Sequence, residues 1–284
     1  MTSHPILSGA GAGAALLVFA SAAAAPAQTD HVGVELVSET TALVPGHSAT
    51  LGLRFVHESH WHTYWINPGD SGLATKLSWK LPPDFRAGEI LWPVPQRFDV
   101  GGLFNFGYSG EALLPVQIDI PASAKAGAAV QLAVEARWLV CREECIPGKA
   151  TLTLDLPLAA EAATDPRWQA AFAAARAVQP QPGRWTGAAH ERGDRIEVTL
   201  AGSRNDAELP SSPTLDAFVV QRQVVAYAPP QISHGAKVLE LSFAKSEYFT
   251  DAPATLDLLL VDGVPPNTRA WNVHAPLTPA KPSP

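Results

Sequence analysis

Apolar and polar residues alternate with a period of two over most of the chain from residue 32 to residue 156. The longest run places an apolar side chain at every even position from Val130 to Val140. This period is typical of an extended strand with one face toward a core and the other toward solvent. Shorter runs with the same period, separated by turns rich in Pro, Gly and Asp, cover 32–36, 51–55, 77–81, 114–120 and 152–156. The pattern predicts an all-β fold, an antiparallel β-sandwich.

Composition excludes several other classes of protein. Twenty-six prolines among 284 residues argue against a helical bundle. An apolar content of 46% is too high for a disordered chain, and two cysteines are too few for a disulfide-dense mini-protein. The net charge of −7 argues against nucleic acid as a partner, because such binding needs a basic face.

The first 27 residues have the composition of a secretory signal peptide. They contain no Asp, Glu, Lys or Arg, and an apolar stretch over 6–19 precedes the sequence Ala25-Pro26-Ala27, which fits an A-x-A cleavage site. A membrane anchor is the alternative, which we favour less because Gly, Ala and Ser dilute the apolar stretch. We therefore expect an exported protein that is soluble after cleavage, with its cysteines in an oxidising compartment.

The alternation breaks at residue 161 and returns later in the chain. Asp165 is a suitable cap and Pro166 a suitable first residue for a helix that reaches about residue 178, and a Pro-rich linker follows. Alternation resumes near residue 196. The predicted organisation comprises a signal peptide, a first β domain, a helix with its linker, a second and smaller β-sandwich-like domain, and a loose tail: 1–27, 28–160, 161–185, 186–276 and 277–284.

The two cysteines, Cys141 and Cys145, directly follow the longest predicted strand. Three intervening residues suit a tight turn that brings the sulfurs within disulfide distance. Cys141 has the parity of the polar positions, so we expect it off the core face. A disulfide that closes so short a loop contributes little to stability, which makes the pair a candidate for redox work. An inert structural disulfide is an equally weighted alternative, and metal binding by the pair alone is a weaker one.

Three histidines, His57, His60 and His62, fall within six residues. On a strand, His60 and His62 would share one face, and such spacing can hold copper or zinc. The interpretation that we favour is a polar strand end whose histidines form local hydrogen bonds.

Residues 97–110 are rich in glycine and aromatic side chains. Glycines would give such a loop mobility, and its aromatics could cover a reactive group as a lid. The alternative, which the residues alone favour, is a long loop whose aromatics pack into the sandwich.

Three motifs, at 62–72, 107–116 and 138–148, resemble the N-terminal periplasmic domain of the thiol:disulfide interchange protein DsbD. The resemblance is closest to the branch of suppressor-of-copper-sensitivity protein B (ScsB) and covers about residues 30–158. It implies an immunoglobulin-like sandwich, and the copper-linked branch can carry a second such domain. The cysteine spacing here is narrower than in DsbD proper.

The resemblance also assigns roles to residues. Cys141 and Cys145 would be the catalytic pair, with Cys145 attacked by the upstream donor and Cys141 as its partner. An aromatic cap loop would shield them, here over 98–110, with Phe104, Phe106 or Tyr108 as the cap. No organic cofactor is needed, because the pair itself carries two electrons. Copper would be a separate metal ion bound by the histidines.

The implied partners are a membrane-embedded electron donor of DsbD/ScsB type and oxidised periplasmic thioredoxin-fold proteins. The function would be that of a thiol–disulfide oxidoreductase, a protein-disulfide reductase-like relay linked to copper tolerance. Since DsbD-type proteins continue into membrane helices, we expect this chain to act as a free-standing module. Two alternatives stay open, namely a non-catalytic, copper-linked periplasmic binding module and an assembly domain with a permanent disulfide.

Overall fold

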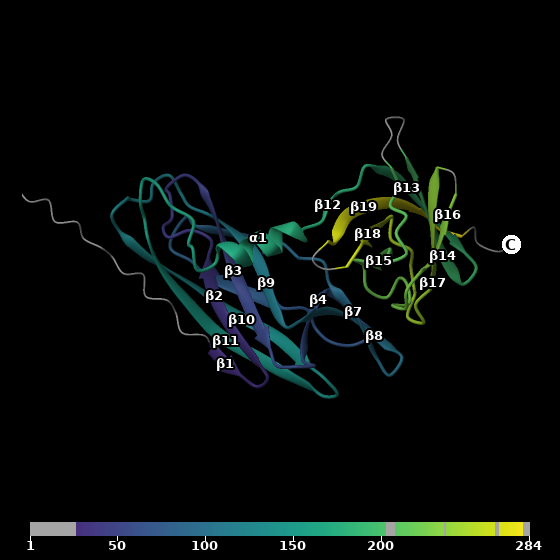
Figure 1. The fold of residues 1–284 in the computed structure, drawn as a ribbon, viewed down its shortest axis with the longest axis horizontal. Helices are drawn as coiled ribbons and strands as arrows, with labels where there is room; N and C mark the ends of the chain where they lie inside the picture. The colour runs from purple at the N-terminus through teal and green to yellow at the C-terminus, as the bar shows by residue number, and fades with distance from the viewer. Residues whose placement is uncertain (1–26, 203–207, 236, 265–266, 281–284) are drawn as a thin grey trace, which may run out of the picture.

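The computed structural model describes residues 27–202, 208–235, 237–264 and 267–280. The predicted signal peptide lies outside the described residues except for Ala27, as do the last four residues of the predicted tail. Strands dominate the described part and form two β-sandwiches that are joined through a helix (Figure 1), so the predicted all-β fold class is confirmed. No helix in these ranges is long and apolar enough to cross a membrane.

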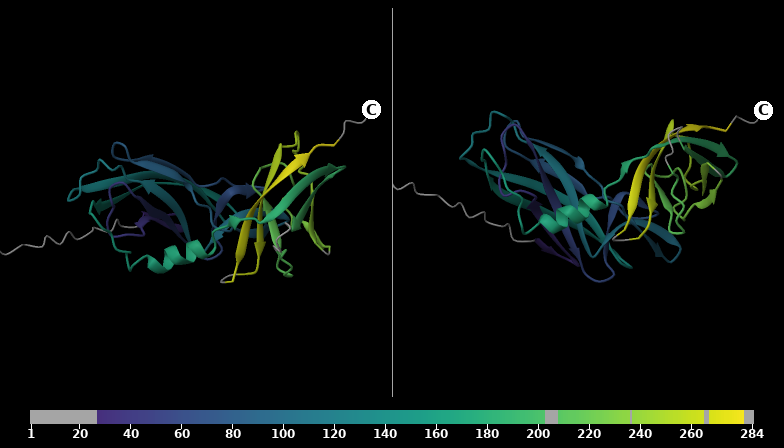
Figure 2. Two further views of the ribbon diagram at one scale, coloured as in Figure 1. Left: turned by 90° about the horizontal axis from the view of Figure 1, so that it is seen from above. Right: turned by 45° about the horizontal axis from the view of Figure 1, so that its top comes forward.

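The first sandwich consists of two antiparallel sheets, seen from two further sides in Figure 2. One sheet has the order β1 (Ala27–Thr29), β2 (Val32–Ser38), β3 (Ser48–His57), β9 (Glu111–Asp119), β6 (Arg86–Ile90). The other has the order β11 (Cys145–Pro157), β10 (Ala129–Cys141), β4 (His62–Gly69), β8 (Leu103–Ser109), β7 (Gln96–Val100), and β5 (Lys76–Lys80) also pairs with β10. The β10–β11 hairpin is the longest, with 13 residues in each strand.

The alternating residues of β10 form the centre of the core. Leu132, Val134 and Ala136 are each 0% exposed and belong to the same apolar cluster as Phe55 and Leu114 of the opposite sheet. Each large apolar side chain buried in this way stabilises the fold by about 1.5–3 kcal/mol. The period of two in the sequence thus corresponds to one sheet face packed against the other.

Helix α1 (Gln169–Ala177) begins three residues later than the sequence predicts, and its N-cap is Trp168. The carboxylate of Asp165 accepts a hydrogen bond from the N–H of Arg167 at 2.9 Å, so it closes a separate turn before the helix. Phe172 is 1% exposed and packs α1 onto the outer side of the first sandwich.

The second sandwich contains the remaining strands. They form one continuous eight-stranded sheet with the order β15 (Asp216–Val219), β18 (Thr255–Asp262), β19 (Arg269–Thr278), β13 (Trp185–Arg192), β14 (Arg195–Gly202), β17 (Val238–Ala244), β16 (Gln231–His234), and β12 (Gln181–Pro182) also pairs with β19. Its core includes the alternating residues Ile196, Val198 and Leu200 of β14. β19 extends to Thr278, two residues into the segment that we expected to be a loose tail.

The two sandwiches share an interface built around Arg97 of β7. Its guanidinium donates two hydrogen bonds to the carboxylate of Asp216, at 2.8 and 3.1 Å, and another to the carbonyl of Tyr227. The same guanidinium lies 4.7 Å from the ring centres of both Phe106 and Phe218. Phe218 and Tyr227 belong to the apolar cluster of the first sandwich, so the two cores meet here.

A second contact across the interface comes from Asn67 of β4. This side chain is fully buried, and its Nδ2 donates to the carbonyl of Val219 at 2.8 Å and to that of Gln221 at 3.3 Å. One end of β4 is therefore fixed to the second sandwich, while the other end, at His62, pairs with Cys141.

Candidate functional site

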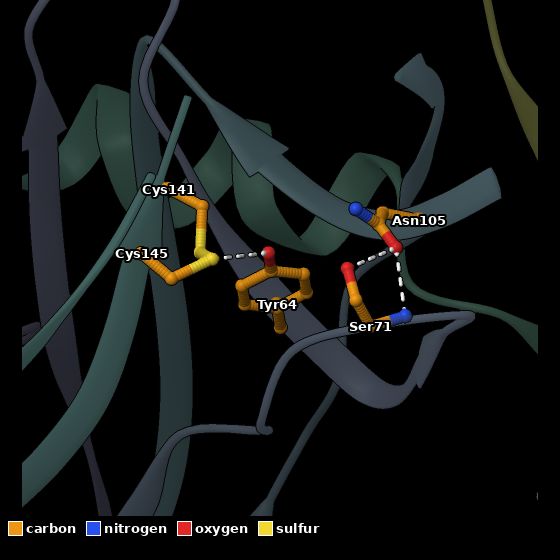
Figure 3. Close-up of a disulfide and its surroundings, with 5 residues drawn as sticks. All are labelled: Tyr64, Ser71, Asn105, Cys141 and Cys145. Atoms are coloured by element: carbon orange, nitrogen blue, oxygen red, sulfur yellow. Dashed lines mark hydrogen bonds between the residues drawn. A yellow bond between two sulfur atoms is a disulfide. The ribbon is translucent and has the colours of Figure 1, made fainter. Parts of the chain in front are cut away.

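Cys141 and Cys145 form a disulfide at the end of the β10–β11 hairpin (Figure 3). Their Cα atoms are 4.2 Å apart, and the two residues are paired where β10 ends and β11 begins. The N–H of Arg142 donates to the carbonyl of Glu144 at 3.0 Å and closes the turn between them. The tight turn that the spacing predicts therefore brings the two sulfurs together.

The two cysteines differ in their access to solvent. Cys141 is 2% exposed, whereas Cys145 is exposed to solvent. Cys141 is not a member of the apolar core cluster of the first sandwich, which agrees with the parity that placed it off the core face. It is buried all the same, because other side chains cover this outer face of the sheet. Of the two cysteines, Cys145 is therefore the one that solvent reaches.

Tyr64 of β4 is the side chain that meets the disulfide. Its hydroxyl oxygen lies 3.7 Å from Cys145 Sγ, and Figure 3 shows the ring beside the two sulfurs. Since a disulfide sulfur carries no proton, the hydroxyl is the donor of this hydrogen bond. Burial raises the pKa of Tyr64, so the hydroxyl keeps its proton at neutral pH.

The segment after β4 holds Tyr64 in place. Oδ1 of Asn105 accepts hydrogen bonds from both the N–H and the hydroxyl of Ser71, each at 3.1 Å (Figure 3). Gly72 follows with φ of 99° and lies so close to the ring of Tyr64 that a Cβ there would be 2.2 Å from it. A residue without a side chain is needed at this position for both reasons.

His62 lies on the same face of β4 as Tyr64. Its ring stacks on Phe98 of β7 with 4.6 Å between centres and meets the ring of Tyr64 edge-on at 5.1 Å. The residue is 4% exposed, and its Nε2 has no hydrogen-bond partner among the described residues. Burial, assisted by the nearby His57, lowers the pKa of His62 to about 4.

The structure keeps His57 near His62 but does not join the three histidines into one cluster. His57 is buried and uses both ring nitrogens, donating to the carbonyl of Gly110 at 2.7 Å and accepting from the hydroxyl of Thr63 at 3.0 Å. His60 lies in an exposed turn with φ of 72°. Across the described ranges, no group of three His, Cys, Asp or Glu side chains could hold a metal ion. Copper binding stays a prediction without a preformed site here.

The aromatics predicted as a cap do not contact the sulfurs. Phe104, Phe106 and Tyr108 alternate on β8 and point to the core face, opposite the face that carries the disulfide. Phe106 is 2% exposed at the interface with the second sandwich, and the hydroxyl of Tyr108 donates to the carbonyl of Pro93 at 2.8 Å. The prediction of a cap from these three residues therefore does not fit their positions, because the loop is a regular hairpin whose aromatics pack inward.

Sequence reasoning missed Tyr64 and Phe98 as residues of the site. Tyr64 has the parity of His62 within the first motif, so its face could have been inferred once the strand was assigned. The place of Phe98 depends on the pairing of β7 with β8, which no local pattern specifies.

The fold and the site together define an immunoglobulin-like β-sandwich that carries one disulfide, with one cysteine exposed and the other buried. Residues 33–157 match the family model of the N-terminal part of the thiol:disulfide interchange protein DsbD. The resemblance that the three motifs carry is thus confirmed for the first sandwich.

Among solved structures, the N-terminal periplasmic domain of ScsB from Proteus mirabilis matches with a TM-score of 0.63 and 19% identity, covering 87% of this chain and 94% of that chain. At this identity the match shows the fold alone. The yeast GGA1 GAE domain has a TM-score of 0.27 at 13% identity, covering 45% of this chain and 94% of that chain. BcpA, the major pilin subunit of Bacillus cereus, has a TM-score of 0.27 at 8% identity, covering 88% and 69%. Neither of these carries an argument about function, and no curated protein matches the sequence.

Proposed function

We propose that this chain is a periplasmic thiol–disulfide exchange module that relays electrons through Cys141 and Cys145. The donor would be a membrane-embedded protein of DsbD/ScsB type, and the acceptors would be oxidised thioredoxin-fold proteins. The observation that carries the proposal is the asymmetry of the disulfide, with Cys145 exposed and Cys141 buried. The match of the first sandwich to the DsbD N-terminal family supports it.

The asymmetry assigns an order to the exchange. A donor thiolate attacks the exposed Sγ of Cys145, the disulfide breaks, and its electron pair leaves with the sulfur of Cys141. A second donor thiolate then attacks the donor sulfur of the mixed disulfide and releases Cys145 as a thiolate. Two electrons have entered the pair, and the donor has become a disulfide. With an oxidised substrate the steps run in reverse, Cys145 attacking first and Cys141 resolving the mixed disulfide.

Two further observations support a location in the periplasm. The N-terminal 27 residues have the composition of a signal peptide, and the solved relative is described as a periplasmic domain. The short loop between the cysteines also fits a working pair, since a sequence separation of four gives the bond little entropic value for stability.

Single-cysteine variants test the proposed order. In Cys141→Ser the exposed Cys145 thiol remains, and in Cys145→Ser the buried Cys141 thiol remains. We expect iodoacetamide to alkylate Cys141→Ser at least tenfold faster than it alkylates Cys145→Ser. Mass spectrometry at matched pH measures both rates. The disulfide form of the wild type should also be reduced by reduced thioredoxin. Equal alkylation rates would contradict the assigned order, and no exchange with thioredoxin would contradict the relay.

A further inference from the structure

The imidazole of His62 is a buried polar group that the disulfide state leaves unused. Its Nε2 is enclosed by protein and has no hydrogen-bond partner in the described part of the chain, although the ring is fixed between Phe98 and Tyr64. An unsatisfied buried group costs free energy, so its presence beside a reactive bond calls for a state in which it is satisfied.

The register of the sheet places His62 directly beside Cys141. The two are Cα partners in the antiparallel pairing of β4 with β10. Side chains of directly paired residues project from the same face with their Cβ atoms about 4.5–5.5 Å apart. The two side chains therefore project side by side from the outer face of the sheet, and Cys141 is the residue whose sulfur leaves when Cys145 is attacked.

A thiolate at Cys141 needs a hydrogen-bond donor from the protein. The residue is 2% exposed, so water cannot replace such a donor, and an unpaired charge at a buried position is costly. The low pKa of His62 leaves the ring neutral at pH 7, with one N–H to donate. The titratable groups that face the ring besides Cys141 are Tyr64 on β4 and His57 on β3.

We propose that His62 donates an Nε2–H hydrogen bond to the Cys141 thiolate in the mixed disulfide. This inference rests on the proposed exchange function and adds a catalytic residue to it. In the step, the attacking sulfur bonds to Cys145, the Cys141–Cys145 bond breaks, and its electron pair stays on Cys141. The imidazole N–H donates a hydrogen bond to that sulfur, and no proton is transferred.

The rate at which dithiothreitol reduces the disulfide of the purified protein tests the proposal. His62→Phe keeps a ring that can stack on Phe98 but has no donor, and we expect its rate to fall at least tenfold, because hydrogen bonds to charged groups are the strong ones. His62→Gln keeps an N–H and should recover most of the rate. His190→Phe, the same substitution at an exposed position of β13, should match the wild type.

A second readout separates hydrogen bonding from packing. In a Cys145→Ser background, Cys141 is the sole thiol. There, His62→Phe should raise the pKa of that thiol by about one pH unit. The absorbance of the thiolate near 240 nm measures this pKa. Unchanged rates and an unchanged thiol pKa in a folded His62→Phe variant would overturn the proposal.

If His62→Phe does not fold, the ¹⁵N chemical shifts of His62 in the Cys145→Ser protein decide instead. Shifts that report a new hydrogen bond from Nε2–H as Cys141 ionises support the proposal. Shifts that stay constant while Cys141 ionises overturn it. Dithiothreitol reduces an accessible disulfide whatever the natural partner is, so these results do not depend on thioredoxin. Failure with thioredoxin alone would count against the proposed function and not against the role of His62.

Discussion

At the scale of single residues, Tyr64 connects the sulfur of Cys145 to strand β4. Its ring is fully buried, while its hydroxyl points at Cys145 Sγ over 3.7 Å. In the reduced protein the same hydroxyl can donate to the Cys145 thiolate, since its raised pKa keeps it protonated. Tyr64 thus contacts the sulfur of Cys145, and His62 is the strand partner of Cys141.

Replacing Tyr64 with Phe removes this donor and keeps the packing. We expect Tyr64→Phe to raise the pKa of the Cys145 thiol in a Cys141→Ser background and to slow its alkylation several-fold at pH 7, because the thiolate loses a hydrogen bond. The pH dependence of alkylation measures both effects. A variant whose thiol titrates like the parent would show that the hydroxyl does not act on Cys145.

The buried His62 also predicts how stability depends on pH. In the unfolded chain a histidine takes up its proton near pH 6.5, whereas folded His62 does so only near pH 4. The unfolded state therefore binds more protons between these values, and the free energy of unfolding falls as pH drops through this window, by about 3 kcal/mol for His62. Burial lowers the pKa of His57 too, so that residue adds to the loss in the same direction.

Urea unfolding at a series of pH values from 7 to 4 measures this loss. The His62→Phe variant should lose about 3 kcal/mol less stability over the window than the wild type does. Parallel pH profiles for the two proteins would mean that folded His62 titrates normally.

At the residue scale, the sequence identifies the cysteines but not the residues around them. Their spacing and position after a long strand were sufficient to predict the disulfide. Tyr64 and His62 needed knowledge of what covers the outer face of the sheet, and a period of two shows only that a face exists. In the described residues the three histidines do not form a preformed metal site, because the chain turns between His57 and His62 and leaves His60 exposed.

At the scale of elements, β4 and the segment after it determine how well the disulfide is covered. The segment from residue 70 to 75 is fixed to β8, where the N–H of Phe104 donates to the Asp70 carboxylate at 2.7 Å. Gly72 within it contacts the ring of Tyr64. The closeness of this segment to the sheet thus depends on a residue without a side chain.

Gly72→Ala tests the contact, and Gly101→Ala is its matched control. Both glycines have a positive φ, of 99° and 66°, but a Cβ at Gly101 meets nothing within 4 Å. We expect Gly101→Ala to cost about 1–2 kcal/mol from its backbone conformation, and Gly72→Ala to cost about 1–3 kcal/mol more because the ring of Tyr64 must move. Gly72→Ala should also speed reduction of the disulfide by dithiothreitol.

Urea unfolding and the dithiothreitol rate together check this prediction. Equal losses of stability in the two variants, with equal reduction rates, would show that the segment does not hold Tyr64 against the disulfide.

The alternation in the sequence was sufficient to predict the strands, as β10 shows. The hairpin of β7 and β8 was harder, because Phe104, Phe106 and Tyr108 alternate correctly for a strand, yet the glycines around them suggested a mobile loop. Residues on both faces of β8 are buried, so the sequence could not tell which face meets the core.

For the whole molecule, the interface between the sandwiches is the feature that ties the site to the rest of the chain. Arg97 and Phe98 are neighbours on β7, one bonded to Asp216 of the second sandwich and the other stacked on His62. Asn67 makes the corresponding contact for β4. The second sandwich therefore supports both strands that carry the site.

Removing the Arg97 guanidinium should weaken this interface. The side chain of Arg97 is 11% exposed and that of Asp216 is 28% exposed, so Arg97→Ala leaves a half-buried carboxylate unpaired and should lower the free energy of unfolding by about 2–4 kcal/mol. Arg192→Ala, which removes an exposed pair with Glu197, should cost less than about 1 kcal/mol.

Calorimetry of the two variants measures this difference. We further expect Arg97→Ala to split a single thermal transition of the wild type into two. Similar small losses in both variants, with one transition each, would show that the sandwiches are not coupled through Arg97. The sequence could not reveal the pair, because 119 residues separate Arg97 from Asp216.

The reduction potential of the Cys141–Cys145 pair tests the central claim most directly. The purified protein would be equilibrated in graded thiol buffers, and its free thiols counted by alkylation and mass shift. A relay predicts a potential between about −270 and −120 mV, the range of known exchange proteins. A potential below about −300 mV would mark a structural disulfide and contradict the account.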